Sequence, residues 1–333
     1  MRAAPHLSKM YNYLFLNGFI VSGIFCGITH AQPADTYPTR PVRVVVPGAS
    51  GSSQDVLARI VGNKLAQQMG QSFVIDARAG ASGMIGLDIA KAAAPDGYTL
   101  LAATSTLLSG LPALKPKLHY DPDRDFIPLS RMASVANIVT VGAQLGVDTA
   151  ADFLKLARAK PGTLTFGSAG NGSPAHLAGA MFNVLAGVNT LHVPYKGSAQ
   201  ALTDIMAGQL QYIITSPLIA MPHAKGGRIK LLATTGAKRD PLIPELPVFA
   251  DTVPGYEITQ WWGLVLPANT PKDISVKLHR EIITALKSSD VVGFLTKQGA
   301  TAQPESPAEF TAFMKAERKR IANIGKRANI VLE

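Results

Sequence analysis

The feature that most constrains the fold is a repeated alternation of short apolar strand patterns with helical patterns, joined by short turns. Val42–Val46 is a mostly valine run, and apolar residues recur at helical spacing from Val56 to Met69. The alternation restarts after Pro128 and continues to Ile229–Thr235. Such βα units with short connections are typical of parallel sheets covered by helices. We therefore predict an α/β protein.

The predicted elements follow one another along most of the chain. Strand patterns lie at 42–46, 73–76, 98–103, 138–141, 165–168, 190–193, 211–215, 229–235 and 261–266. Helical patterns lie at 56–69, after Gly83 through 94, after Thr149, after Ser173, at 198–207 and 217–225, after Thr270, at 291–297 and after Ser306. The last begins Ser306-Pro307-Ala308-Glu309, which is a capping box with proline at the first helical position.

The length of 333 residues exceeds the usual size of one hydrophobic core, so two domains are expected. Proline-rich stretches near 121–136 and 241–258 are the predicted crossings between them. We predict one domain from 32–133 with 259–333 and another from 134–258. The predicted fold class is α/β, with two doubly wound α/β domains joined by a two-strand hinge around a cleft.

The first 31 residues have the order of a secretory signal peptide. Arg2 and Lys9 precede an apolar run over 11–28, and Thr29-His30-Ala31 offers small side chains at the two positions that a signal peptidase inspects. We predict cleavage after Ala31 and export to the periplasm. The alternative is an uncleaved anchor, because about 18 apolar residues is the lower limit for a membrane span.

Charge and cysteine content change once that segment is removed. The whole chain carries a net charge of +10, and the loss of Arg2 and Lys9 leaves +8 on residues 32–333. The single cysteine, Cys26, leaves with the same segment. The remaining lysines and arginines are scattered singly, without a basic stripe interleaved with aromatics, so nucleic acid is not expected as a partner.

Signals for catalysis are weak. Gly48-Ala49-Ser50-Gly51 and Gly80-Ala81-Ser82-Gly83 each fall one residue short of the Gly-x-Ser-x-Gly nucleophile elbow. No phosphate-binding Gly-x-x-x-x-Gly-Lys motif is present, and the histidines after residue 31 are too widely spaced for a clustered metal site. We therefore expect no enzyme activity, no cofactor and no metal. A serine hydrolase using Ser50 or Ser82 is the alternative function.

Signals for anion binding are stronger. Glycine- and serine-rich turns at Gly48–Asp55, Gly80–Gly86 and Ser168–Ser173 each join the end of a predicted strand to a helix. Backbone N–H groups and the helix dipole at such a terminus favour an anion by about 0.3–1 kcal/mol. Because the first and third turns belong to different predicted domains, they are expected to face each other across the cleft. The alternative for each is an ordinary βα turn.

Several sequence blocks, in order, carry a family resemblance. They are Tyr37-Pro38-Thr39-Arg40-Pro41-Val42-Arg43, Asp55 with Ala58-Arg59, Ala94-Pro95-Asp96-Gly97-Tyr98-Thr99-Leu100, Tyr120-Asp121-Pro122 with Asp125-Phe126, Gly167-Ser168-Ala169-Gly170-Asn171-Gly172-Ser173 with His176-Leu177-Ala178-Gly179, and His192-Val193-Pro194-Tyr195-Lys196-Gly197. With these blocks, residues 32–333 resemble the periplasmic solute-binding proteins of tripartite tricarboxylate transporters, the Bug or TctC-like receptors.

The resemblance implies a type II periplasmic binding protein-like fold that closes on a hinge. It also implies a monomeric receptor that captures a small carboxylate and delivers it to membrane transporter subunits or to a sensor. In that family, backbone amides, hydroxyls and ordered water hold the ligand carboxylate, and charged side chains play little part.

Departures from the family pattern bear on specificity. The first ligand loop of the family commonly reads Pro-Phe-Pro-Pro-Gly-Gly-Ser-Thr-Asp, whereas this chain has Pro47-Gly48-Ala49-Ser50-Gly51-Ser52-Ser53-Gln54-Asp55 and lacks the bulky apolar wall. Family members that resemble amino-acid binders place an acidic residue where this chain has Thr215-Ser216. We therefore predict a ligand without an α-amino group.

Twelve residues are the predicted ligand-binding set. They are Ser50, Gly51, Ser52, Ser53, Thr104, Ser105, Ser168, Ala169, Gly170, Asn171, Thr215 and Ser216. Asp55 is expected to have a structural role at the start of its helix, because a carboxylate facing an anionic ligand would repel it. Trp261 and Trp262 are expected to pack between the domains or in a core.

Overall fold

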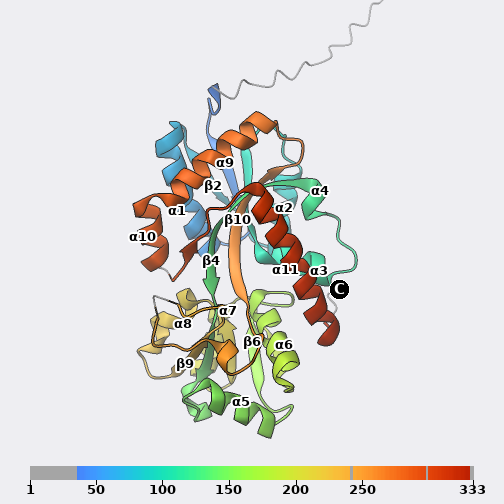
Figure 1. Cartoon of the computed structure of the whole chain (residues 1–333), viewed down its shortest axis with the longest axis vertical. Helices are drawn as coiled ribbons and strands as arrows, with labels where there is room; N and C mark the ends of the chain where they lie inside the picture. The colour runs from blue at the N-terminus through green and yellow to red at the C-terminus, as the bar shows by residue number, and fades with distance from the viewer. Residues whose placement is uncertain (1–35, 241–242, 298, 331–333) are drawn as a thin grey trace, which may run out of the picture. The chain divides into compact units, whose positions relative to one another are not determined.

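The computed structural model describes residues 36–240, 243–297 and 299–330 (Figure 1). All described residues belong to one compact unit. The predicted signal peptide and its cleavage site after Ala31 lie outside the described residues. None of the described helices has the length and apolar character needed to cross a membrane.

The first sheet has six strands in the order β11-β4-β10-β3-β1-β2. Their bounds are β1 (Val42–Val46), β2 (Phe73–Ala77), β3 (Thr99–Thr104), β4 (Phe126–Ala136), β10 (Thr259–Pro267) and β11 (Thr301–Ala302). Strand β1 pairs in parallel with β2 and β3, whereas β10 is antiparallel to both β3 and β4. Figure 1 shows β4 and β10 as the long paired strands in the middle of the described unit.

The second sheet has five strands in the order β7-β6-β8-β5-β9. Their bounds are β5 (Ile138–Gly142), β6 (Thr165–Ser168), β7 (Leu191–Pro194), β8 (Tyr212–Thr215) and β9 (Ile229–Thr234). Strand β6 pairs in parallel with β7 and β8, and β5 is antiparallel to β8 and β9. We call each sheet with its covering helices a lobe, the first lobe for the six-stranded sheet and the second for the five-stranded one.

Helices cover both faces of each sheet. In the first lobe these are α1 (Ser53–Met69), α2 (Met84–Lys91), α9 (Lys272–Lys287), α10 (Ser289–Lys297) and α11 (Pro307–Arg327). In the second they are α5 (Ala150–Ala159), α6 (Pro174–Ala186), α7 (Ser198–Met206) and α8 (Pro217–Ala224). Short helical segments are η2 (Ala81–Gly83), η3 (Thr106–Gly110), α3 (Leu111–Leu114), α4 (Pro122–Asp125), η4 (Ala143–Leu145) and η5 (Phe249–Asp251).

Strand β10 shows how the first sheet buries both faces. Trp262, Leu264 and Leu266 pack with residues of α1 and α9 on one face, and Trp261 and Val265 pack on the other. On that second face, Trp261 meets two aromatic rings of α11 edge-on, with centroids 5.5 and 5.4 Å away. Both tryptophans are fully buried. The expected core role is therefore confirmed for Trp261.

The predicted class of two α/β domains is confirmed, and the structure corrects three details. Both sheets are mixed rather than parallel. The stretch 121–136, for which no helix or strand was predicted, folds as α4 and the 11-residue strand β4, and the chain enters the second sheet directly after it. The helix predicted to reach residue 94 ends at Lys91. The predicted domain boundaries stay a prediction, with 133/134 falling inside β4 and 258/259 directly before β10.

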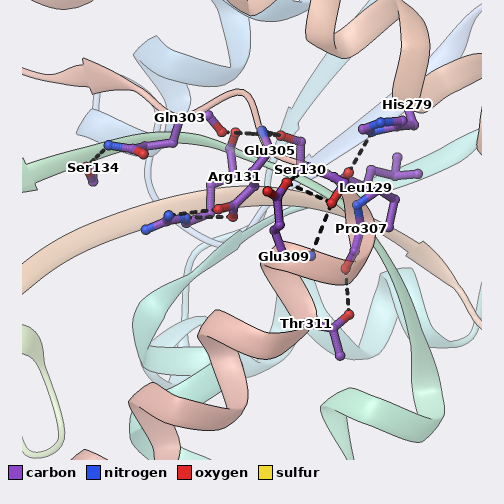
Figure 2. A network of polar contacts seen from close by, with 11 residues as sticks. Leu129, Ser130, Arg131, Ser134, His279, Gln303, Glu305, Pro307, Glu309 and Thr311 are labelled. Atoms are coloured by element: carbon purple, nitrogen blue, oxygen red, sulfur yellow. Dashed lines mark hydrogen bonds and ion pairs between the residues drawn. The ribbon is translucent and has the colours of Figure 1, made fainter.

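The segment before α11 is tied to β4 by a polar network (Figure 2). Arg131 donates to both carboxylate oxygens of Glu305 at 2.7 and 2.8 Å, and the Glu305 N–H donates to the buried Ser130 hydroxyl at 3.1 Å. The Gln303 amide donates to Ser134 at 2.8 Å. This network holds the segment before α11 against β4 of the first lobe.

Candidate functional site

A cavity of about 730 Å³ lies at the carboxyl ends of strands β1, β6 and β8. Its walls are Gly48, Ala49, Ser50, Gly51, Ser52, Ser53, Gln54, Val56, Leu57, Asn137, Ala169, Pro174, Ala175, Lys196, Gly197, Ser198, Ala199, Ile214, Thr215, Ser216, Leu218, Ile219, Gln260 and Trp262. Both lobes contribute, and the volume lies in the range of small-molecule sites, about 300–1,000 Å³. Ligands of open α/β sheets bind at this end of the strands.

The first wall is the turn between β1 and α1. Gly51 has φ +79°, a left-handed conformation that glycine adopts without strain. Its N–H donates to the Asp55 carboxylate at 2.9 Å, and Arg59 donates to both oxygens of the same carboxylate at 2.9 and 3.0 Å. Asp55 is buried and is absent from the cavity wall. The expected structural role of Asp55 is therefore confirmed.

Electrostatics at this turn follow from the same contacts. Burial acts to raise the pKa of Asp55, but the hydrogen bonds from Arg59 and from the Gly51 N–H outweigh it and hold the pKa below its usual value. The carboxylate stays charged and keeps the turn closed. Ser52 is the N-cap of α1, yet its hydroxyl makes no capping hydrogen bond.

The turn after β6 is fixed from behind by two histidines. The buried Ser168 hydroxyl lies 2.6 Å from His192 Nε2 and accepts from the Gly170 N–H at 3.0 Å. His176 Nδ1 accepts from the Gly172 N–H at 3.0 Å, and the two imidazole rings stack with centroids 4.0 Å apart. Burial, with a smaller effect of His176, lowers the pKa of His192 to about 4. At neutral pH this pair is uncharged and rigidly placed.

The turn after β8 supplies another wall. Ser216 is the N-cap of α8, and its hydroxyl accepts from the Leu218 N–H at 3.3 Å. Thr215 and Ser216 are both buried. The turn before α7 adds Lys196, Gly197, Ser198 and Ala199 to the lining. Cavity residues thus follow β1, β6, β7 and β8, which all end at the same side of their sheets.

The charge of the cavity is simple. Lys196 is the only charged residue among those that line it, and no Asp or Glu of the described chain takes part. Lys196 is exposed and makes no ion pair within the described ranges. The described residues contain no group of three or more histidine, cysteine or acidic side chains that could hold a metal ion. The walls therefore suit a small anion held mainly by neutral groups.

Comparison with known families identifies the chain. The family described as "Tripartite tricarboxylate transporter family receptor" matches residues 57–330.

The chain belongs to the tripartite tricarboxylate transporter receptor family.

Relatives and solved structures of this receptor family cover nearly the whole chain. Protein BugT of Bordetella pertussis is 33% identical over 319 residues, covering 94% of this chain and 98% of BugT. The structure of R. palustris Rpa4515 with adipate is 35% identical with a TM-score of 0.82, covering 89% of this chain and 99% of that one. MatC (Rpa3494) from Rhodopseudomonas palustris with bound malate is 30% identical with a TM-score of 0.77, covering 86% and 99%.

Within this receptor fold, seven of the predicted binding residues line the cavity and five do not. Those in the wall are Ser50, Gly51, Ser52, Ser53, Ala169, Thr215 and Ser216. Those outside it are Thr104, Ser105, Ser168, Gly170 and Asn171. Thr104 instead accepts from the Leu107 N–H at 3.3 Å, and Ser105 lines a separate cavity of about 10 Å³. Ligand contact by any of the twelve stays a prediction.

The Gly80–Gly86 turn, the second of the three anion-site candidates, adds nothing to the cavity wall. A Cβ on Gly86 would lie 2.8 Å from the Pro47 Cα, so glycine is needed there for close backbone packing. The turn supports the first cavity wall from outside.

The predicted set lacks 17 of the 24 residues that line the cavity, including several with polar side chains. Asn137, Lys196, Gln260 and Trp262 were not in the predicted set. Lys196 had a usable signal, because it lies in a turn between a predicted strand and a predicted helix, like the turns that were chosen. Asn137, Gln260 and Trp262 had none, since their place depends on how β4 and β10 pair.

The serine hydrolase alternative rests on Ser50 or Ser82 as nucleophile. No histidine of the described residues hydrogen-bonds to Ser50 or Ser82. The Ser–His contact that does occur, between Ser168 and His192, involves a fully buried serine. An activated serine nucleophile has an adjacent base and access to substrate. Among the described residues, Ser50 and Ser82 have no histidine partner, and Ser168 is buried.

Proposed function

We propose that this protein is a periplasmic receptor that captures a small carboxylate without an α-amino group in the cavity between its lobes. It would then deliver the ligand to a tripartite tricarboxylate-type transporter or to a sensor. The observation that carries the proposal is the composition of the cavity wall. Hydroxyls, turns at helix N-termini and one lysine surround about 730 Å³ of space, and no carboxylate of the described chain faces it.

The absence of a carboxylate in that wall is what disfavours amino acids. An α-ammonium group transferred from water into a half-enclosed site needs a counter-charge or several acceptors. Thr215 and Ser216 offer only hydroxyls, and that of Ser216 already accepts from a backbone N–H. A carboxylate, by contrast, finds neutral donors and Lys196.

Family members with known ligands support the same chemistry. Two of the similar structures hold adipate and malate, which are dicarboxylates without an amino group. Two charged ends would suit a cavity with donors on several sides. We propose a dicarboxylate of about this size as the ligand class.

Binding measurements test this proposal directly. The exported protein is screened by thermal shift and then by calorimetry against succinate, adipate, malate and citrate, with aspartate and glutamate as amino-bearing counterparts. We expect saturable stabilisation by at least one of the first four and no turnover of it. Tighter binding of aspartate than of succinate would contradict the prediction that the wall at Thr215 disfavours a ligand ammonium group.

Localisation has its own measurement. Mass spectrometry of protein recovered from the periplasm should show Gln32 as the N-terminal residue, which corresponds to cleavage after Ala31. Protein retained in the inner membrane with residues 1–31 attached would favour the uncleaved anchor. Transport and sensing are separated by deleting the genes of candidate membrane subunits and measuring uptake of the ligand found in the screen.

A further inference from the structure

Three side chains in the wall of the cavity carry buried polar atoms without hydrogen-bond partners. They are the Ser52 hydroxyl, both amide atoms of Asn137 and the indole N–H of Trp262. The exposed fraction is 1% for Asn137 and 0% for Trp262. The three come from different elements: the start of α1, the residue between β4 and β5, and the middle of β10.

Such unpaired groups destabilise a folded protein. Leaving a buried donor or acceptor unsatisfied costs about 1–3 kcal/mol, and nearly all buried polar groups in folded proteins are paired. Among the described residues, three further side chains have such an atom, namely Gln68, Ser109 and Trp261, and none of these lines the cavity. Four of the seven unpaired atoms therefore belong to residues that line one cavity, and three of the four, the Ser52 hydroxyl, the Asn137 amide nitrogen and the Trp262 indole nitrogen, are donors that a bound anion can satisfy.

The backbone around these groups is firmly held. The Asn137 N–H donates to the Thr235 hydroxyl at 2.9 Å, and its carbonyl accepts from the Thr235 N–H at 2.8 Å. Trp262 lies in the sheet between Thr104 and Ala133. Groups held in this way lose little freedom when a ligand binds, so they can add affinity at low entropic cost.

The chemistry of the three side chains selects a carboxylate. The indole N–H, the amide NH₂ and the serine hydroxyl are all neutral donors, and Ser52 lies at the N-terminus of α1, where the helix dipole is positive. We propose that Ser52, Asn137 and Trp262 form a subsite that hydrogen-bonds one carboxylate group of the ligand. This inference rests on the proposed function, and it adds Asn137 and Trp262, which are outside the predicted set, to Ser52, which is within it.

Nuclear magnetic resonance offers a readout without any mutation. The protein contains two tryptophans, Trp261 and Trp262, so a ¹⁵N-labelled sample gives two indole N–H signals. They lie on opposite faces of β10, and only Trp262 borders the cavity. On titration with a dicarboxylate series from succinate to adipate, we expect the Trp262 signal to shift downfield and the Trp261 signal to stay. The Trp261→Phe variant assigns the two signals.

Matched variants measure the contribution to affinity. Hydrogen bonds to a charged group are worth about 1.5–3 kcal/mol, so Asn137→Leu and Trp262→Phe should each weaken binding about 10- to 100-fold. Ser52→Ala should do so about tenfold. Trp261→Phe and Ser109→Ala remove equally buried, equally unpaired groups outside the cavity and should change affinity less than about twofold. Ligand-free Asn137→Leu should be at least as thermostable as the wild type, because an unsatisfied amide is removed.

Each outcome is decisive. Cavity variants that bind as tightly as their controls, or a Trp262 signal that does not move while ligand binds, overturn the subsite. A loss of affinity matched by an equal loss of ligand-free stability in Asn137→Leu also overturns it, because a structural role would then explain both. A wild-type protein that binds no carboxylate in the screen contradicts the proposed function instead.

Discussion

Replacing Asp55 by asparagine tests whether one buried carboxylate holds the first ligand turn in shape. The side chain of Asp55 is 3% exposed and accepts the Gly51 N–H as well as two hydrogen bonds from Arg59. Asparagine keeps the shape but loses the charge and turns an NH₂ group toward a neighbouring donor. The turn that carries Ser50, Gly51 and Ser52 would lose its anchor.

The magnitude follows from the partners. A hydrogen bond to a buried charged group contributes about 1.5–3 kcal/mol. Arg59 is half-exposed, so an i,i+4 pair of this kind contributes only about 0.3–0.5 kcal/mol. We therefore expect Asp55→Asn to lower the free energy of unfolding by about 2 kcal/mol. Arg59→Gln, which leaves the Gly51 contact intact, should lower it by about 0.5 kcal/mol.

Urea denaturation of the two variants and the wild type is the assay, with calorimetric binding of the best carboxylate beside it. Asp55→Asn should also bind about tenfold more weakly, since a mobile turn must be ordered by the ligand. The pKa of Asp55 is depressed, so its stabilisation is present above the unfolded pKa near 4 and is lost as pH falls through the lower folded value. The free energies of unfolding of the wild type and of Asp55→Asn should therefore become equal in acid. Equal costs for Asp55→Asn and Arg59→Gln would refute the reasoning.

Three further perturbations probe the cavity and its support. Lys196→Gln should weaken dicarboxylate binding about fivefold and reduce the salt dependence of the affinity, whereas Lys225→Gln, outside the cavity wall, should do neither. The affinities are measured by calorimetry at low and high salt. If the two variants bind equally well at both salt concentrations, Lys196 has no role in binding. Thr215→Asp should reverse the ligand preference, so that aspartate binds more tightly than succinate. An unchanged ratio of the two affinities would show that a ligand ammonium group does not lie near residue 215. Because burial lowers the pKa of His192 to about 4, the unfolded state takes up a proton first, and stability should fall as pH drops from about 6.5 toward 4. In His192→Gln that fall should be shallower by urea denaturation, and an identical pH profile would contradict the buried neutral imidazole.

Much of the fold was predictable because local patterns encode it. Val42–Val46 and Tyr212–Thr215 are apolar runs next to turn residues, and the capping box at Ser306 forms as its sequence predicts. Strand β4 was missed, because Pro128 and small residues such as Ala133 hide the strand pattern that pairing with β10 imposes. Strand direction was also hidden, since an apolar run reads the same in parallel and antiparallel sheets.

Some residues of the candidate site could likewise be predicted from local sequence patterns, and others could not. Turns at strand ends, such as the one with Ser52, could be placed from the chain itself, and most of the residues chosen there line the cavity. Asn137 and Trp262 could not, because an asparagine between two strands and a tryptophan in a strand have many structural uses. Only the pairing of β4 with β10 and the crossing into β5 bring them to one wall. Ser168 lies outside that wall, and its hydroxyl is within hydrogen-bond distance of His192.

The pairing of β4 with β10 also bears on how the polypeptide acquires its structure during synthesis. The strands of the second sheet all lie between Ile138 and Thr234, so that sheet can form from one continuous stretch. The first sheet cannot close until Thr259–Pro267 arrives, and the contacts of Arg131 with Glu305 need a still later segment. Non-local pairing of this kind slows folding. A chain interrupted before residue 259 would leave β3 and β4 without the partner strand between them, exposing sheet edges to aggregation and proteolysis.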